Sequence, residues 1–214
     1  MDLDISHMRF LTDLGTLSLT IFVLCFLIST FTSGKTFKKG HTARAVRSEY
    51  RRSWAKEIMK NEKLDSAVDV FRNSITISSA MMGGLVIAFG LVANALVQAT
   101  DSGISLQLAF ILAILTYAIF NILMQIRALM YLPIILKVPG KVIEKNEKES
   151  KEEYVSKLLD NSYDDFANSI RSMFYLIVLL VFSLDKLLFI AVTIILTYLF
   201  VRRDLSEKSR IEIF

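Results

Sequence analysis

Stretches without charged residues alternate with strongly charged stretches along this chain. No charged side chain occurs in residues 75–100 or 103–126, and Asp13 is the only one between Phe10 and Phe31. A bilayer core takes about 20 apolar helical residues to cross, and a soluble core needs no charge-free run of this length. The pattern therefore predicts membrane-spanning helices over about 10–32, 73–98 and 105–127, with the third helix extending to about residue 136.

A fourth apolar segment, residues 172–201, contains Asp185 and Lys186 at its middle. One interpretation is a single long or broken helix, which would hold both charges at depth and leave Arg202 and Arg203 outside the cell. The alternative is a hairpin with Asp185 and Lys186 at its tip, which returns those arginines to the inside. Its halves look short for a core of about 30 Å. The first interpretation is favoured, and the hairpin remains its rival.

The charged stretches predict the orientation. Residues 33–72 are rich in Lys and Arg, whereas the turn at residues 99–104 contains neither. Lys and Arg near helix ends favour the cytoplasmic side. The loops 33–72 and 137–171 are therefore predicted to be cytoplasmic, with the N-terminus outside a multi-pass protein of the cell (plasma) membrane.

Composition agrees with an all-α integral membrane helical bundle, in which the four long apolar segments and the basic, helical cytoplasmic loops form a single membrane domain over 1–214. The chain has 214 residues, of which 53% are hydrophobic, and a mean hydropathy of +0.48. The single cysteine, Cys25, excludes an internal disulfide. Because His7 and His41 lie far apart and no Cys/His cluster exists, neither a metal nor another cofactor is predicted.

Small and polar side chains mark the predicted membrane helices. A stripe on the second helix comprises Ala80, Gly83, Gly84 and Ala88, and small residues let helix backbones approach closely in lipid. Amide side chains occur at Asn94, Asn121 and Gln125. Such amides need hydrogen-bond partners in hydrocarbon, so they are predicted to face the bundle interior and to form hydrogen bonds between helices. The alternative is a polar pathway for an ion or solute, to which Asp185 and Lys186 would contribute if they lie at the midplane.

Single arginines lie near the predicted cytoplasmic boundary of three membrane helices: Arg72 with Asn73 beside it, Arg127 and Arg171. The simple interpretation is anchoring of helix ends by cationic side chains. The sharper hypothesis is a ring of guanidinium groups that binds an anion or an acidic lipid headgroup, or that pairs with Asp69 and Asp165.

Residues 43–64 predict a basic amphipathic helix with Val46, Tyr50, Trp54 and Ile58 on one stripe. Such a helix is suited to lie on anionic lipid headgroups. Nucleic-acid binding is not expected, because no recognition motif accompanies the charge.

Several short motifs resemble a family of membrane proteins catalogued as domain of unknown function 599. They are Arg52-Ser53-Trp54, Val70-Phe71-Arg72-Asn73-Ser74, Gln125-Ile126-Arg127, Arg171-Ser172-Met173-Phe174-Tyr175 and Arg203-Asp204. The resemblance covers about residues 45–204 and implies a shared fold without a known reaction. Where relatives carry Pro and Gly-Pro in the last segment, this chain has Val178 and Asp185-Lys186, so the kink expected of the family is not predicted here.

The sequence contains no catalytic motif, and enzymatic activity is not expected. The leading functional hypothesis is an oligomeric channel or transporter for an ion or small solute. A bundle of 24.3 kDa is small for a pore, which favours a homo-oligomer. The alternative is a membrane scaffold or accessory subunit that binds anionic lipid or a cytoplasmic partner.

Overall fold

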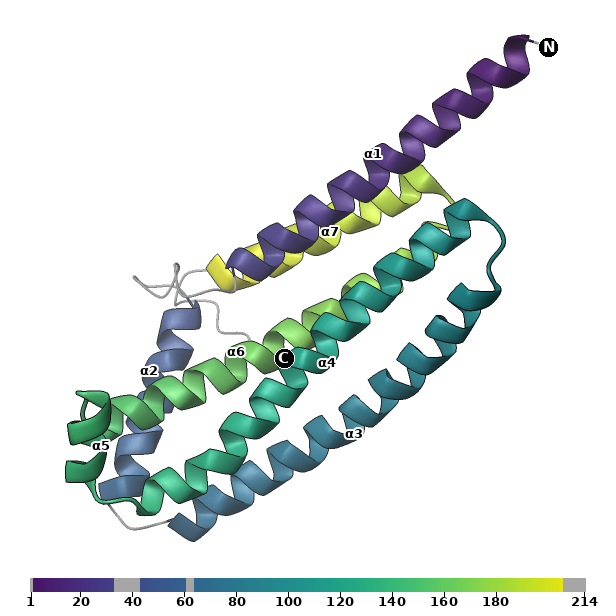
Figure 1. Cartoon of the computed structure of the whole chain (residues 1–214). Helices are drawn as coiled ribbons and strands as arrows, with labels where there is room; N and C mark the ends of the chain where they lie inside the picture. Colours follow the sequence, from purple (N-terminus) through teal and green to yellow (C-terminus); the bar gives the residue numbers. More distant parts are fainter. Residues whose placement is uncertain (1, 33–42, 61–63, 206–214) are drawn as a thin grey trace. The chain divides into compact units, whose positions relative to one another are not determined.

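The computed structural model describes residues 2–32, 43–60 and 64–205, and helices account for nearly all of them (Figure 1). The helices, in chain order, are α1 (Asp2–Thr32), α2 (Ala43–Lys60), α3 (Leu64–Gln98), α4 (Ser102–Lys137), α5 (Gly140–Glu147), α6 (Lys151–Val181) and α7 (Lys186–Leu205). The predicted all-α class is confirmed, since no strand occurs within these ranges. Residues 33–42 and 61–63 of the predicted loop 33–72 lie outside the described residues.

The helices are longer than the apolar segments that predicted them. Helix α3 begins at Leu64 instead of about residue 73, and α6 begins at Lys151 instead of residue 172. The predicted loop 137–171 is therefore mostly helix. Helical hydrogen bonds satisfy the backbone in water as well as in lipid, so a helix stabilised by packing continues past the end of its apolar run.

The chain divides into two compact units. The central unit is Arg44–Ser172, and the terminal unit combines Met1–Ala43 with Met173–Phe214. The boundary falls within α6, so this one helix contributes its first part to the central unit and its last part to the terminal unit.

In the central unit, the hydrophobic core lies where α3 begins, α4 ends and α6 begins, and α2 packs there as well (Figure 1). The buried residues are Ala55, Ile58, Ala67, Phe71, Leu129, Leu132, Leu136, Val155 and Leu159. The Trp54 ring meets that of Phe71 edge-on, with their centroids 6.0 Å apart. This core explains why the polar ends of the helices are ordered, because each contributes apolar side chains at helical spacing.

Helix α3 leaves this core and continues with little cover. In the most apolar part of Asp65–Gln98 only 6% of the residues are buried, against 39% for Ser102–Lys137. Leu91 is 68% exposed and Val97 is 86% exposed. Asp101 caps the start of α4, because its side chain accepts a hydrogen bond from the backbone N–H of Ile104. It continues through Pro133 to Lys137 as one helix, so it does not break at Pro133.

The last segment is a helical hairpin, which was the rival interpretation, and the favoured prediction of one long or broken helix over 172–201 is wrong. Helix α6 ends at Val181 and α7 begins at Lys186. Ring contacts link Phe174 to Phe200 and Phe182 to Phe189. The earlier residue of α6, Phe174, contacts the later residue of α7, Phe200, and the reverse holds for Phe182 and Phe189. Helix α7 therefore runs antiparallel to the end of α6. The turn forms without proline or glycine, because the Val181 carbonyl accepts the N–H groups of both Leu184 and Asp185.

Tyr175 joins the three helices of the terminal unit. Its hydroxyl donates to the Cys25 carbonyl of α1 at 3.2 Å and shares a 2.8 Å hydrogen bond with the Thr197 hydroxyl of α7. The ring meets Phe22 edge-on at 5.6 Å, and Phe22 stacks on Phe189 at 5.4 Å. All three aromatic side chains are buried. This aromatic cluster therefore holds α1, α6 and α7 together.

We expect Tyr175→Ala to lower the free energy of unfolding by about 3–5 kcal/mol, because it leaves a large cavity. Tyr175→Phe keeps the ring and loses only the hydroxyl, at about 1 kcal/mol. Denaturant unfolding in detergent micelles measures both changes. Tyr198→Phe is the matched control, since Tyr198 is exposed on α7, and it should have no effect. Equal results for Tyr175→Phe and Tyr198→Phe would contradict a role for the Tyr175 hydroxyl.

Candidate functional site

Two of the three predicted amides, Gln125 and Asn121, lie inside the central unit. The Ser78 hydroxyl of α3 donates to Gln125 Oε1 of α4 at 2.9 Å, and both side chains are buried. The amide nitrogen of Asn121 donates to the Tyr117 carbonyl one turn earlier, at 2.7 Å. Gln125 therefore links two helices, whereas Asn121 bonds to its own helix.

The third amide lies elsewhere, and its predicted place in the bundle interior is wrong. Asn94 is exposed on α3, and its Oδ1 accepts a 3.3 Å hydrogen bond from the side chain of Gln98. A partner one turn away replaces the partner expected on another helix. A buried amide that was not predicted is Asn168 of α6, whose Oδ1 has no hydrogen-bond partner in the described structure.

The small-residue stripe of α3 is not packed against another helix in the described part of the chain. Ala80, Gly83 and Gly84 are exposed, and a Cβ added at either glycine would meet nothing within 4 Å. Ala88 is half-buried. The close helix packing expected of this stripe within the chain is therefore absent here, because α4 lies on another face of α3.

The predicted arginines have different surroundings. Arg72 is exposed and pairs with Asp69 at 3.4 Å, and Asn73 beside it is also exposed. Arg127 is exposed, with its guanidinium 5.9 Å from the centroid of the Tyr131 ring. Arg171 is 9% exposed, so it is the buried member of the group.

The helix registers also separate these arginines along the bundle axis. The Ser78–Gln125 bond sets the register of α3 on α4, and a bond from Ser169 to the Ala118 carbonyl sets that of α6 on α4. With a rise of about 1.5 Å per residue, Arg72 and Arg127 lie about one turn apart, whereas Arg171 lies about 15 Å from Arg127. The three arginines therefore do not form a ring at one level.

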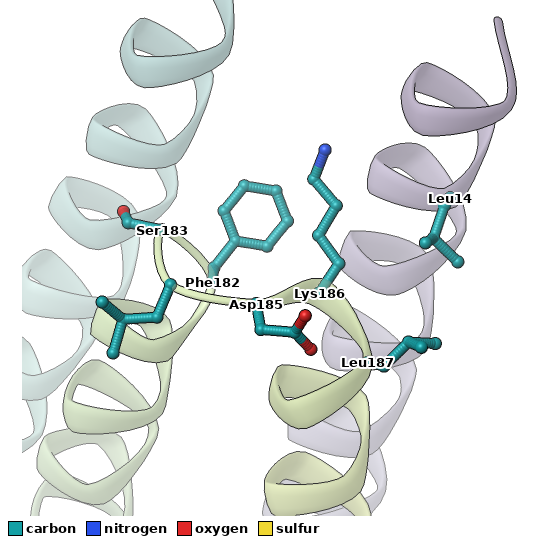
Figure 2. Close-up of a pocket in the computed structure, with 7 residues that line it drawn as sticks. Leu14, Phe182, Ser183, Asp185, Lys186 and Leu187 are labelled. Carbon is teal, nitrogen blue, oxygen red and sulfur yellow. The ribbon is translucent and has the colours of Figure 1, made fainter. Parts of the chain in front are cut away.

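Asp185 and Lys186 lie at the tip of the α6–α7 hairpin (Figure 2), not in the middle of a helix. Asp185 Oδ1 accepts a 2.7 Å hydrogen bond from the backbone N–H of Leu188. Asp185 thereby satisfies one of the unpaired N–H groups at the start of α7. Asp185 and Lys186 belong to the terminal unit, whereas Asn121 and Gln125 belong to the central unit.

A polar network that the sequence reasoning missed fastens α2 to α6. Arg51 Nε lies 2.6 Å from Asp160 Oδ1, and the Ser48 hydroxyl donates to the other carboxylate oxygen. The guanidinium also lies 5.0 Å from the centroid of the Tyr163 ring. The signal in the sequence was an acidic residue one position after Leu159, on the buried side of an amphipathic helix.

This network changes the interpretation of α2. Val46 and Ile58 are buried inside the protein, whereas Tyr50 is 60% and Trp54 37% exposed. The four residues were predicted to face lipid headgroups together. The four side chains therefore do not share one environment, because Val46 and Ile58 lie on the face of α2 that packs against the rest of the central unit.

Lys151 stabilises the other end of the same assembly. Its amine donates to the carbonyls of Leu136 and Val138, each at 2.8 Å. These carbonyls lie at the C-terminal end of α4, where no helical N–H remains to pair with them. Partial burial lowers the pKa of the Lys151 amine.

Among the described side chains, no group of His, Cys, Asp and Glu has an arrangement suited to a metal ion.

Taken together, these observations define an all-α protein with long, poorly covered apolar helices. Two of the described helices, Asp65–Gln98 and Ser102–Lys137, are long and apolar enough to cross a membrane. A family model described as "Protein of unknown function, DUF599" matches residues 17–209. The chain belongs to this family, as the sequence motifs indicated. No curated protein and no solved structure matches the chain.

We expect Asp160→Asn to lower the free energy of unfolding by about 3 kcal/mol, because it leaves the Arg51 guanidinium buried without a counter-charge. The double variant Arg51→Met with Asp160→Leu removes both charges and should recover part of this loss. Denaturant unfolding of the purified protein measures both.

The matched control is Lys56→Gln, which breaks the exposed Lys56–Glu152 pair. Its effect should stay within about 0.5 kcal/mol. If Asp160→Asn is as mild as this control, the network does not fasten α2 to α6.

Proposed function

We propose that this chain is a multi-pass protein of the cell membrane and acts as a scaffold or accessory subunit, not as a channel. The observation that carries the proposal is that buried polar side chains link neighbouring helices: Ser78 of α3 bonds to Gln125 of α4, and Ser169 of α6 bonds to the Ala118 carbonyl of α4. No catalytic step is part of the proposal, and self-association stays a prediction of the sequence.

The membrane placement is supported by the uncovered surface of α3. Soluble monomers rarely expose a contiguous apolar patch of more than a few hundred Å². Ile87 is 67% exposed, and Leu91 and Val97 extend the same apolar surface along α3. All backbone groups inside such a helix are satisfied internally, which is the condition for contact with lipid.

The choice of a scaffold over a channel is supported by the pairing of polar groups. A pathway needs polar side chains that line one continuous cavity. Gln125 instead bonds to Ser78, and Ser169 bonds to the Ala118 carbonyl. Such bonds hold helices together in lipid.

The hairpin supports a topology with five crossings, by α1, α3, α4, α6 and α7. Helix α7 has 20 residues, which corresponds to about 30 Å and is enough for the bilayer core. The N-terminus then lies outside, and Arg202 and Arg203 lie inside with the basic stretch 33–72. This arrangement agrees with the preference of Lys and Arg for the cytoplasmic side.

The exposed face of α2 suits the anionic inner surface of the membrane. Tyr50 and Trp54 are exposed there together with Arg52, Lys56 and Lys60. Basic residues near an anionic leaflet each contribute about 1 kcal/mol, and Trp and Tyr favour the interface. Because α2 is fastened to α6, this face is presented by a rigid element.

Cysteine labelling tests the topology. In a Cys25→Ala background, we expect Ser102→Cys to react with a membrane-impermeant maleimide on intact cells. Lys141→Cys and Lys208→Cys should react only after the cells are opened. Labelling of Lys208→Cys from outside would refute the five-crossing arrangement, and the two other positions calibrate the outer and inner signals.

Flux measurements test the scaffold against the channel. We expect liposomes of phosphatidylethanolamine and phosphatidylglycerol that contain the purified protein to be as tight to K⁺, Cl⁻ and protons as empty liposomes. Gln125→Leu should leave this seal intact, because Gln125 serves as a link between helices. Reproducible flux that Gln125→Leu alters would instead establish a conducting pathway.

A further inference from the structure

The outer face of α4 remains apolar toward the C-terminal end of the helix. Met130, Tyr131 and Ile134 are 60%, 50% and 60% exposed. Their spacing of three and four residues places them on one side of the helix together with Arg127. The opposite side of α4 is the packed one, which includes the fully buried Leu132. The chain therefore leaves a continuous apolar patch open on α4.

The level of this patch follows from the helix registers. Helices α3 and α4 run antiparallel (Figure 1), and counting from the hydrogen bond that links them places Asp69 of α3 level with Ile134. Counting in the same way from the bond between α6 and α4 places Lys157 of α6 level with Met130. Both charged side chains are exposed, so water surrounds this level in the proposed membrane placement. An apolar patch exposed to water marks a site of interaction with another molecule.

The charges beside the patch indicate which molecule this is. Helix α4 has two charged residues, Arg127 and Lys137, and both are cationic and exposed. They favour a partner with carboxylates at the corresponding level. The same chain has such carboxylates on α3, where Asp65 and Asp69 are exposed on the side that faces away from α4. Asp69 pairs with Arg72 of its own helix, and such an exposed pair holds its carboxylate only weakly.

The outer faces of α4 and α3 match level by level. Copies of one chain in one bilayer lie at the same depth, so levels counted within one copy also apply between copies. Lys137 then lies between the levels of Asp65 and Asp69. Nearer the lipid core, Phe120 is 59% exposed on the same side of α4 and lies level with Gly83. A Cβ at Gly83 would meet nothing within 4 Å, so this part of α3 has room for a ring from another copy.

We propose that copies of this chain associate through a heterologous contact, in which the outer face of α4 of one copy packs on the outer face of α3 of the next. The proposal rests on the membrane placement proposed above, because a shared bilayer aligns the levels. An acidic cytoplasmic protein would meet Lys137 but would not reach Phe120. Since each copy presents both faces, the contact can repeat from copy to copy.

Disulfide cross-linking of the full-length chain in membranes tests this contact. In a Cys25→Ala background, Met130→Cys and Asn73→Cys are placed in separate, differently tagged copies that are produced together. The two positions are level and exposed, and neither is charged. We expect oxidation to give a dimer that carries both tags, because a disulfide needs a close approach of the two Cα atoms. Lys157→Cys, exposed on α6 at the level of Met130, is the matched control and should not cross-link to Asn73→Cys.

Native mass spectrometry in a neutral detergent tests the charges and the fit. We expect Lys137→Glu to weaken association about tenfold, because it brings like charges together. Adding Asp65→Lys should recover part of this loss. Lys60→Glu makes the same charge change on the exposed face of α2 and should associate as the unchanged protein does. Gly83→Leu should weaken association through its bulk opposite Phe120, with an unchanged circular dichroism spectrum.

Each outcome decides a separate question. A dimer formed by Met130→Cys alone, in the yield of the mixed dimer, would show a two-fold contact and overturn the heterologous one. Equal cross-linking of Lys157→Cys and Met130→Cys to Asn73→Cys would reflect random collisions and overturn the contact itself. Equal association of Lys137→Glu and Lys60→Glu overturns the charge pairing. The maleimide labelling pattern predicted above does not depend on association, so the contact can fail while the membrane topology stands.

Discussion

Everything in this structure depends on the apolar surface of α3, which the described chain leaves almost uncovered. Its backbone groups are paired within the helix, so only the side chains need a favourable environment. Each fully covered Leu, Ile or Val would contribute about 1.5–3 kcal/mol relative to exposure in water. Within the described residues, only 6% of the most apolar part of α3 is buried. Lipid provides the missing environment in the proposed placement.

The same constraint explains where the protein packs against itself. The core of the central unit contains Phe71, Leu132 and Leu159, which lie near the start of α3, the end of α4 and the start of α6. There, water makes burial favourable, and the Arg51–Asp160 pair fastens α2. In the proposed membrane placement, apolar packing farther along the helices has no advantage over lipid, and the helices are linked there by hydrogen bonds such as Ser78–Gln125. Hydrophobic burial therefore orders one end of the unit, and polar links align its other part.

Runs with little or no charge were sufficient to predict helices at α1, α3 and α4, because a helix pairs the backbone N–H and C=O groups of a segment within that segment, as an apolar environment requires. They could not predict where these helices begin, since Ala67 and Phe71 extend α3 into the charged stretch. Nor could helical spacing show that Val46 and Ile58 face protein while Tyr50 and Trp54 do not. Asn94 and Arg171 show the same limit: their partners and depth depend on the registers between helices. One sequence alone does not contain those registers.

The hairpin shows how a missed helix boundary changes the interpretation of a charge. Counted from residue 172, the last segment seemed too short to cross twice and too charged to cross once. Because α6 begins at Lys151, the crossing proposed for it includes polar residues that the protein buries, such as Ser169 and Ser172. The stretch of α7 between Lys186 and Arg202 contains no charged residue. Lys186 and Arg202 are separated by about 24 Å of helix, which places both near the interfaces in the proposed topology. An ionisable pair that would have been costly at the midplane becomes part of the membrane boundary.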